Sequence, residues 1–187
     1  SKELVAKFKA KFIKEAQMIA SLNHPNIIRI HDIFEENGTA YYVMEYHDGG
    51  SLSSLSLPLP VAEAVRYIRQ VASALSYLHK RNIMHLDVKP ANVLIDGEGN
   101  AVLIDFGISK RYDESGGQTS STPVGVSNGY APIEQYSQAV SKFTPATDAY
   151  SLGATFYKLL TGNTPPDASL LVCEPENCKE FVLANSD

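Results

Sequence analysis

The sequence of 187 residues has no tryptophan, only two cysteines and no long apolar run. A membrane-spanning helix needs about 20 predominantly apolar residues, so no span is predicted, and no signal peptide is visible. Two cysteines fit a reducing, cytoplasmic compartment better than a disulfide framework. The net charge of −5 argues against nucleic-acid binding, which rests on Lys and Arg. The rest of the composition, 44% hydrophobic and 20% charged, is that of an ordinary globular protein.

A short β-hairpin is predicted late in the first half of the chain. Apolar runs at 93–95 and 101–104 flank the turn cluster DGEGN, a pattern typical of two antiparallel strands joined by a tight turn. Pairing of Val93 with Ile104 and of Ile95 with Val102 would place Asn92 opposite Asp105. Directly opposed residues have Cβ atoms about 4.5 to 5.5 Å apart. The register therefore predicts that two oxygen-bearing side chains meet at the open end of the hairpin.

The segment that leads into this hairpin, IMHLDVKPAN at 83–92, adds Asp87 and Lys89 to the pair. Mg²⁺ prefers oxygen ligands, takes one or two from the protein, and fills its other positions with water and substrate phosphates. Asn92 and Asp105 are the candidate ligands. These residue types predict a site for a metal ion and a phosphate group.

Two motifs in a fixed order resemble those of a known enzyme family. HLDVKPANV, followed thirteen residues after its asparagine by DFG, resembles the catalytic and metal-binding loops of eukaryotic-type protein kinases. Other stretches resemble the hinge region, the activation segment and the central helix of the large lobe. They are NHPNIIRIHDIF, AYYVMEYHDGGSL, GYAPIEQY and TDAYSLGATFYKLLTG. The wording of GYAPIEQY indicates a bacterial source.

The resemblance implies an α+β, two-lobed protein-kinase-like fold. Residues 1–46 would be a remnant of the small lobe, with its helix C and last strands. Residues 47–187 would form the hinge and a mainly helical large lobe, truncated or gapped. The implied reaction is Mg²⁺-dependent transfer of the γ-phosphate of ATP to Ser or Thr hydroxyls of a protein substrate. Lysine followed by proline, at Lys89-Pro90, is typical of the serine/threonine branch.

The resemblance also assigns roles within the catalytic loop. The transition state of phosphoryl transfer spreads negative charge over the transferred group, so positioning and electrostatics outweigh covalent chemistry. Asp87 would accept the proton of the substrate hydroxyl, and Lys89 would place a cation on the γ-phosphate. Asn92 and Asp105 would hold Mg²⁺. Ser127 falls where the family usually has a threonine that contacts the catalytic Asp and Lys.

Two acidic residues in predicted helices each have two interpretations. Glu15 lies at the edge of the apolar stripe of a helix predicted over 3–22, where it could pair with Lys11 one turn away. The resemblance instead makes it the partner of an ATP-binding lysine on a strand before Ser1. Asp148 could be a plain helix N-terminal acid. By resemblance it would accept hydrogen bonds from the backbone of the catalytic loop.

The segment after the second of two early strands would receive the adenine ring. Strands are predicted at 27–34 and 41–46, joined by an Asn-Gly turn. By resemblance Met44 is the gatekeeper, and the carbonyl of Glu45 and the amide of His47 contact adenine. Met44 also suits simple core packing.

Three features depart from the family pattern. Leu86 replaces an arginine, so phosphate on the activation segment would find no guanidinium partner in the catalytic loop, and dephosphorylation is expected to change kcat little. The glycine-rich loop and strand lysine are missing, so the 187 residues alone are not expected to be a working kinase. Near 53–60 and 172–175 the sequence is short of the family pattern, and we expect residues of the natural polypeptide to be omitted there.

Three classes of function remain open on the sequence. An active kinase is favoured by the joint presence of the catalytic and metal-binding residues. A kinase-fold scaffold, or pseudokinase, would bind nucleotide or partner proteins without catalysis, as the missing strands would favour. A metal-dependent hydrolase built on His85 and Asp87 lacks further ligands, and the resemblance makes His85 a core residue packed under Phe106.

Overall fold

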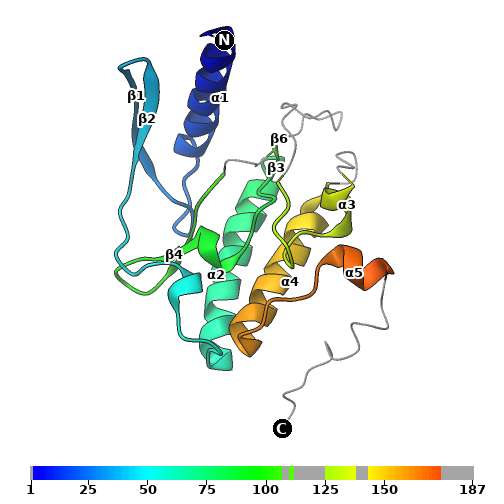
Figure 1. Ribbon diagram of the computed structural model, residues 1–187. Coiled ribbons are helices and arrows are strands. Elements are labelled where there is room, and N and C mark those ends of the chain that lie inside the picture. The colour runs from blue at the N-terminus through cyan, green and yellow to red at the C-terminus, as the bar shows by residue number, and fades with distance from the viewer. Residues whose placement is uncertain (1, 107–109, 112–124, 138–142, 174–187) are drawn as a thin grey trace.

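The computed structural model describes residues 2–106, 110–111, 125–137 and 143–173 (Figure 1). The fold is α+β, as expected, with a helix and a β-hairpin standing above a mainly helical body (Figure 1). The helices are α1 (Lys2–Ala20), α2 (Val61–His79), α3 (Ile133–Tyr136), α4 (Pro145–Thr161) and α5 (Ala168–Cys173). The strands are β1 (Ile30–Glu36), β2 (Thr39–Met44), β3 (Ile83–Met84), β4 (Val93–Ile95), β5 (Ala101–Leu103) and β6 (Lys110–Arg111).

The β1–β2 hairpin lies beside α1 (Figure 1). Asn37 and Gly38 at its turn have φ of 51° and 77°, as a type I′ turn requires, so the predicted Asn-Gly hairpin is confirmed. Phe12 of α1 stacks on Tyr42 of β2 with ring centroids 5.3 Å apart. Aromatic stacking thus joins the helix to the hairpin.

The predicted start of the first strand was wrong. Residue 27 forms an isolated bridge with Leu103, and the amide of Ile28 donates to the carbonyl of Leu103 at 3.0 Å. The backbone at residues 27 and 28 therefore pairs with β5 and not with β2, and β1 begins only at Ile30. The hairpin is tied to the body through this short connection.

The predicted first helix is present, but its apolar stripe is buried only near its C-terminal end. Ala16 and Ile19 lie in the core, whereas Phe8 is 63% exposed and Phe12 is 36% exposed. Amphipathic spacing predicts a helix face but not what covers it.

Helices α2 and α4 lie side by side and form the centre of the body (Figure 1). The N-terminus of α4 has a capping box, in which the Thr144 hydroxyl accepts from the amide of Ala146 and Thr147 Oγ1 accepts from the amide of Thr144. Gly162 ends the helix with φ of 74°, a left-handed conformation that glycine adopts without steric cost. The cap and the glycine fix where α4 begins and ends.

The β4–β5 hairpin exists, but its predicted register was wrong by one residue. Val93 pairs with Leu103 and Ile95 with Ala101. The prediction aligned the outer ends of two apolar runs of unequal length, whereas the observed pairs are symmetric about Glu98, the middle residue of the turn. Asp96 Oδ1 closes this turn by accepting from the amides of Glu98 and Asn100 at 2.9 and 2.7 Å. The turn, and not the length of the flanking apolar runs, therefore sets the register of this hairpin.

No helix within the described ranges combines the length and the apolar character that crossing a membrane requires.

Candidate active site

The loop between β3 and β4 carries the candidate catalytic residues. His85, Leu86 and Val88 are buried, whereas Asp87 and Lys89 are partly exposed. The apolar side chains therefore anchor the loop in the core and turn the two charged side chains towards the surface.

Asp87 is the centre of a compact polar cluster. Its Oδ2 atom accepts from Lys89 Nζ at 2.9 Å and from Asn92 Nδ2 at 2.8 Å. Its Oδ1 atom accepts from Ser127 Oγ at 2.5 Å. Lys89 Nζ also donates to Ser127 Oγ at 2.9 Å. The expected contact of Ser127 with Asp87 and Lys89 is thus confirmed, although forty residues separate the serine from the aspartate.

The side chain of Asn92 has a fixed orientation. Its Nδ2 atom donates both to the backbone carbonyl of Asp87 and to Asp87 Oδ2, each at 2.8 Å. The donors of the amide therefore face Asp87, and Oδ1 is the atom suited to a cation. Asn92 is buried, so the surrounding core holds this orientation.

Asp105 does not lie directly opposite Asn92, because the register differs from the prediction. Asn92 instead accepts from the amide of Ile104 at 2.9 Å, and Asp105 is the next residue along the chain. Its φ of 61° turns the chain out of the strand direction. The hairpin still brings Asn92 and Asp105 to its open end, because Asp105 directly follows the residue that is hydrogen-bonded to Asn92.

His85 is a core residue, as expected. It is fully buried, and its ring meets Phe106 edge-on with centroids 4.9 Å apart. Its Nδ1 accepts from the amide of Asp87 at 3.3 Å, so Nε2 carries the proton and donates to the carbonyl of Ile104 at 3.0 Å. Burial lowers the pKa of His85, which keeps the ring neutral. With both nitrogens engaged, the hydrolase hypothesis loses its proposed metal ligand.

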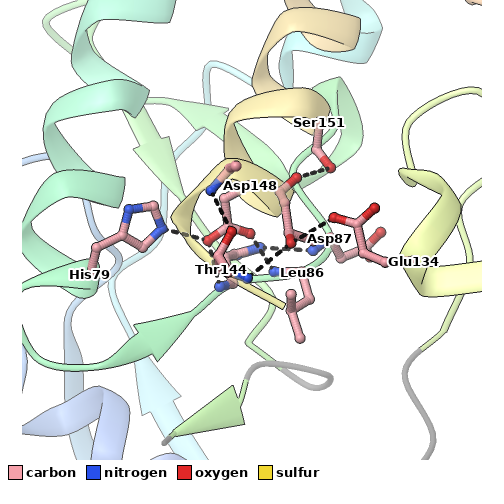
Figure 2. A network of polar contacts seen from close by, with 10 residues as sticks. His79, Leu86, Asp87, Glu134, Thr144, Asp148 and Ser151 are labelled. Carbon is pink, nitrogen blue, oxygen red and sulfur yellow. Dashed lines mark hydrogen bonds and ion pairs between the residues drawn. The ribbon is translucent and has the colours of Figure 1, made fainter. Parts of the chain in front are cut away.

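Asp148 of α4 accepts hydrogen bonds from the backbone of the loop between β3 and β4, and Figure 2 shows the contacts made by Asp148. Its Oδ1 accepts from the amide of Leu86 at 2.8 Å, and its Oδ2 from the amide of His85 at 3.0 Å. The side chain is fully buried. Asp148 therefore fixes the backbone just before Asp87, which confirms the second of its two interpretations.

Leu86 adopts a backbone conformation that leucine rarely takes. Its φ is 67°, and such conformations cost on the order of 1 to 3 kcal/mol. The hydrogen bond from its backbone amide to Asp148 and the burial of its side chain hold it in this conformation. The loop carrying Asp87 is therefore held in place by contacts with the body of the molecule.

Sequence reasoning missed His79, which contacts the same carboxylate. His79 is the last residue of α2, and its Nε2 lies 2.7 Å from Asp148 Oδ2 (Figure 2). A buried carboxylate needs donors or a cation nearby. The available signal was a histidine ending a core helix shortly before the catalytic loop, which by itself does not identify a partner.

We expect His79→Leu to lower the free energy of unfolding by about 1.5 to 3 kcal/mol, because the substitution removes a donor from a buried charged group. Equilibrium urea unfolding of the natural protein measures the change. His79→Gln should recover part of the loss, since its amide can donate to Asp148. His31→Leu, at an exposed position of β1, is the control. Equal stability of His79→Leu and the wild type would contradict the assigned contact.

Glu15 lies in α1, and Met44 is the last residue of β2. Glu15 Oε1 is 3.4 Å from Lys11 Nζ, so the structure contains the pairing that helical spacing predicts. The interpretation of Met44 as a core residue was wrong, because the residue is 42% exposed. Within the part of the chain that the structure describes, Met44 ends β2 in a two-stranded sheet, which gives it little cover.

The segment after β2 runs along the hairpin that carries Asn92. The amide of Glu45 donates to the carbonyl of Arg29 at 3.0 Å, and the amide of Ile95 in β4 donates to the carbonyl of Gly50 at 2.9 Å. A Cβ on Gly49 would lie 2.5 Å from the carbonyl oxygen of Ile95, so only glycine allows this approach. The segment that contains Glu45 and His47 is thus fastened beside the Asn92 hairpin.

Comparison with known proteins identifies the family that this fold and site define. The protein kinase domain model matches residues 1–174, and the chain belongs to that family. It is 37% identical over 168 residues to the serine/threonine-protein kinase PrkC of Bacillus subtilis, covering 88% of this chain and 26% of that protein.

Two further relatives have similar identities. One is the serine/threonine-protein kinase PknJ of Mycobacterium tuberculosis, 36% identical over 164 residues, covering 84% of this chain and 27% of that protein. The other is the serine/threonine-protein kinase GIN4 of Saccharomyces cerevisiae, 36% identical over 157 residues, covering 82% of this chain and 13% of that protein. The chain spans about a quarter of the length of the two bacterial relatives. The kinase resemblance and the α+β fold class expected from the sequence are confirmed.

Proposed function

We propose that this chain carries the phosphate-transfer site of a Mg²⁺-dependent protein serine/threonine kinase. The reaction would move the γ-phosphate of ATP to a Ser or Thr hydroxyl of a protein substrate. The observation that carries the proposal is the cluster in which Asp87 contacts Lys89, Asn92 and Ser127 at 2.5 to 2.9 Å. Kinase relatives at 36 to 37% identity support the same reaction.

Asp87 would orient the substrate hydroxyl and accept its proton. Its contacts with Lys89 and Ser127 fix the carboxylate in one position, and positioning is the main contribution of protein groups to phosphoryl transfer. Lys89 would exchange its contact with Asp87 for the γ-phosphate of ATP. A serine at 127 would keep the acceptor hydroxyl of the substrate close to both.

Asn92 and Asp105 would hold Mg²⁺. The donor set fits the ion, because it consists of a carboxylate and an amide whose donors are turned away by two hydrogen bonds to Asp87. Bound Mg²⁺ would neutralise charge on the phosphates of ATP. Asn92, which contacts Asp87, would then hold the ion on the same side of the site as that carboxylate.

The remaining assignments concern the nucleotide and the lobes. Residues 1–46 would form a remnant of the small lobe, and residues 47–187 the hinge and large lobe. The carbonyl of Glu45 and the amide of His47 would bind adenine, with Met44 beside the ring. Glu15 would leave Lys11 to pair with an ATP-binding lysine, because the contact at 3.4 Å is long and partly exposed. The composition favours a cytoplasmic location.

The experiment is a transfer assay on the natural full-length protein with labelled ATP, Mg²⁺ and a generic protein acceptor. We expect label on serine or threonine, identified by phosphoamino-acid analysis, and its loss when EDTA removes the metal. ATP binding without any transfer to protein would instead support the scaffold alternative. Label confined to tyrosine would contradict the proposed branch.

A further inference from the structure

Gln135 is a fully buried polar residue that the proposed chemistry does not use. It lies in the four-residue helix α3, and its Nε2 donates to the carbonyl of Leu86 at 2.8 Å and to the carbonyl of Gly125 at 3.3 Å. Both partners are acceptors only, so the amide nitrogen must face them. The side chain thus joins two segments that lie far apart in the sequence.

The first of these segments is the catalytic loop. Leu86 has φ of 67° and directly precedes Asp87. Its amide is held by Asp148 from α4, and its carbonyl is held by Gln135 from α3. The carbonyl belongs to the peptide group that enters Asp87, so the contact with Gln135 restrains the orientation of that group.

The second segment carries Ser127. Gly125, the other acceptor of Gln135, stands two residues before this serine, whose hydroxyl donates to Asp87 at 2.5 Å. Gln135 therefore restrains both partners of the contact between Ser127 and Asp87.

The helix that carries Gln135 is itself fixed to α4. Thr147 Oγ1 donates to Glu134 Oε1 at 2.8 Å, and Thr147 belongs to the capping box of α4 (Figure 2). Helix α4 also supplies Asp148. One rigid helix thus positions both groups that hold Leu86.

We propose that Gln135 is a positioning residue that couples the Ser127 segment to the catalytic loop through uncharged hydrogen bonds. Leu86 is apolar and buried, so residue 86 offers no cation to a phosphate group, and the coupling through Gln135 needs none. This inference rests on the proposed function and adds a residue to it. It also gives a structural reason for the expectation that dephosphorylation changes kcat little.

The test uses Gln135→Met, which keeps the length of the side chain and removes both donors. We expect kcat to fall about tenfold or more, since small displacements of catalytic groups have large effects on rate. The KM for ATP should stay within about twofold, because the residue lies away from the nucleotide groups. The loss should be the same with and without phosphatase treatment.

Gln135→Glu separates positioning from mere stability. A carboxyl group facing two buried carbonyls has a raised pKa, and its protonated form can donate one hydrogen bond. The kcat of Gln135→Glu relative to the wild type should therefore rise as pH falls from about 8.5 to about 6, while that of Gln135→Met stays flat. Gln70→Met is the matched control, because Gln70 makes two comparable hydrogen bonds, to Asn100 and Ala101, away from the loop.

Three results of the kinetic assays would overturn the inference. They are unchanged kcat in Gln135→Met, equal losses in both Gln135 variants at every pH, and a tenfold loss of wild-type kcat on phosphatase treatment alone. A wild type without transfer activity would count against the proposed function, and the inference would then be judged by amide hydrogen exchange. Gln135→Met should speed exchange at residues 85–89 and 125–127, and Gln70→Met should not. Unchanged exchange would overturn it.

Discussion

Asp87→Asn is expected to reduce kcat for phosphate transfer by a factor on the order of 10² to 10⁴, the usual contribution of a general base. The substitution conserves shape, so the loop should keep its fold. The new amide cannot accept a proton from the substrate hydroxyl. Its nitrogen is a hydrogen-bond donor and would replace an oxygen that now accepts hydrogen bonds. Lys89, Asn92 and Ser127 all donate to this carboxylate.

A single-turnover assay on the natural full-length protein measures the effect on transfer, with binding of Mg-ATP measured separately. Binding should change little, because Asp87 is not a proposed metal ligand. Asp32→Asn is the control, since it removes the same charge from an exposed position of β1. Equal rates for Asp87→Asn and the wild type would refute the assigned role.

The sequence alone brings Asp87, Lys89 and Asn92 together, because they belong to one short loop. Asp87, Lys89 and Asn92 lie within six positions, so any fold that forms the loop brings them near one another. Ser127 and Asp148 are distant in sequence and could be placed only by resemblance to the family. The structure confirms the contacts of both.

Other contacts were beyond the sequence because they depend on tertiary packing. His79 and Gln135 carry ordinary helix signals, and only the arrangement of α2, α3 and α4 brings them to the loop. The strand predicted from residue 27 lost its first residues to pairing with Leu103, a partner distant in sequence. The pattern of residues around a strand does not show which distant strand it will pair with.

The register of β4–β5 shows how a one-residue error in strand pairing changes a prediction about function. The prediction aligned the outer ends of two apolar runs of unequal length, Val93 with Ile104, although the turn sets the register of a hairpin. The observed pairs are symmetric about Glu98, the middle residue of the turn, and Asp96 closes this turn with its own carboxylate. Asn92 and Asp105 still share the open end of the hairpin. The amide of Ile104 donates a hydrogen bond to the carbonyl of Asn92, and Asp105 directly follows Ile104.

That shared position makes Asp105→Asn the sharpest test of the metal site. We expect the Mg²⁺-dependent part of ATP affinity to fall on the order of 100-fold or more, since even partners of metal ligands contribute 10- to 100-fold. The fold should persist, because asparagine tolerates the left-handed conformation that Asp105 adopts at φ of 61°.

Calorimetric titration of the natural protein with ATP, in the presence and absence of Mg²⁺, isolates the metal-dependent part. Glu98→Gln is the matched control, because it removes one negative charge from the exposed turn of the same hairpin. Its affinity should equal that of the wild type. ATP binding without Mg²⁺ should be no weaker in Asp105→Asn, because a negative charge near the phosphates has been removed. An Mg-ATP affinity that survives the substitution would show that Asp105 is not a ligand, and the proposed pairing with Asn92 would have to be abandoned.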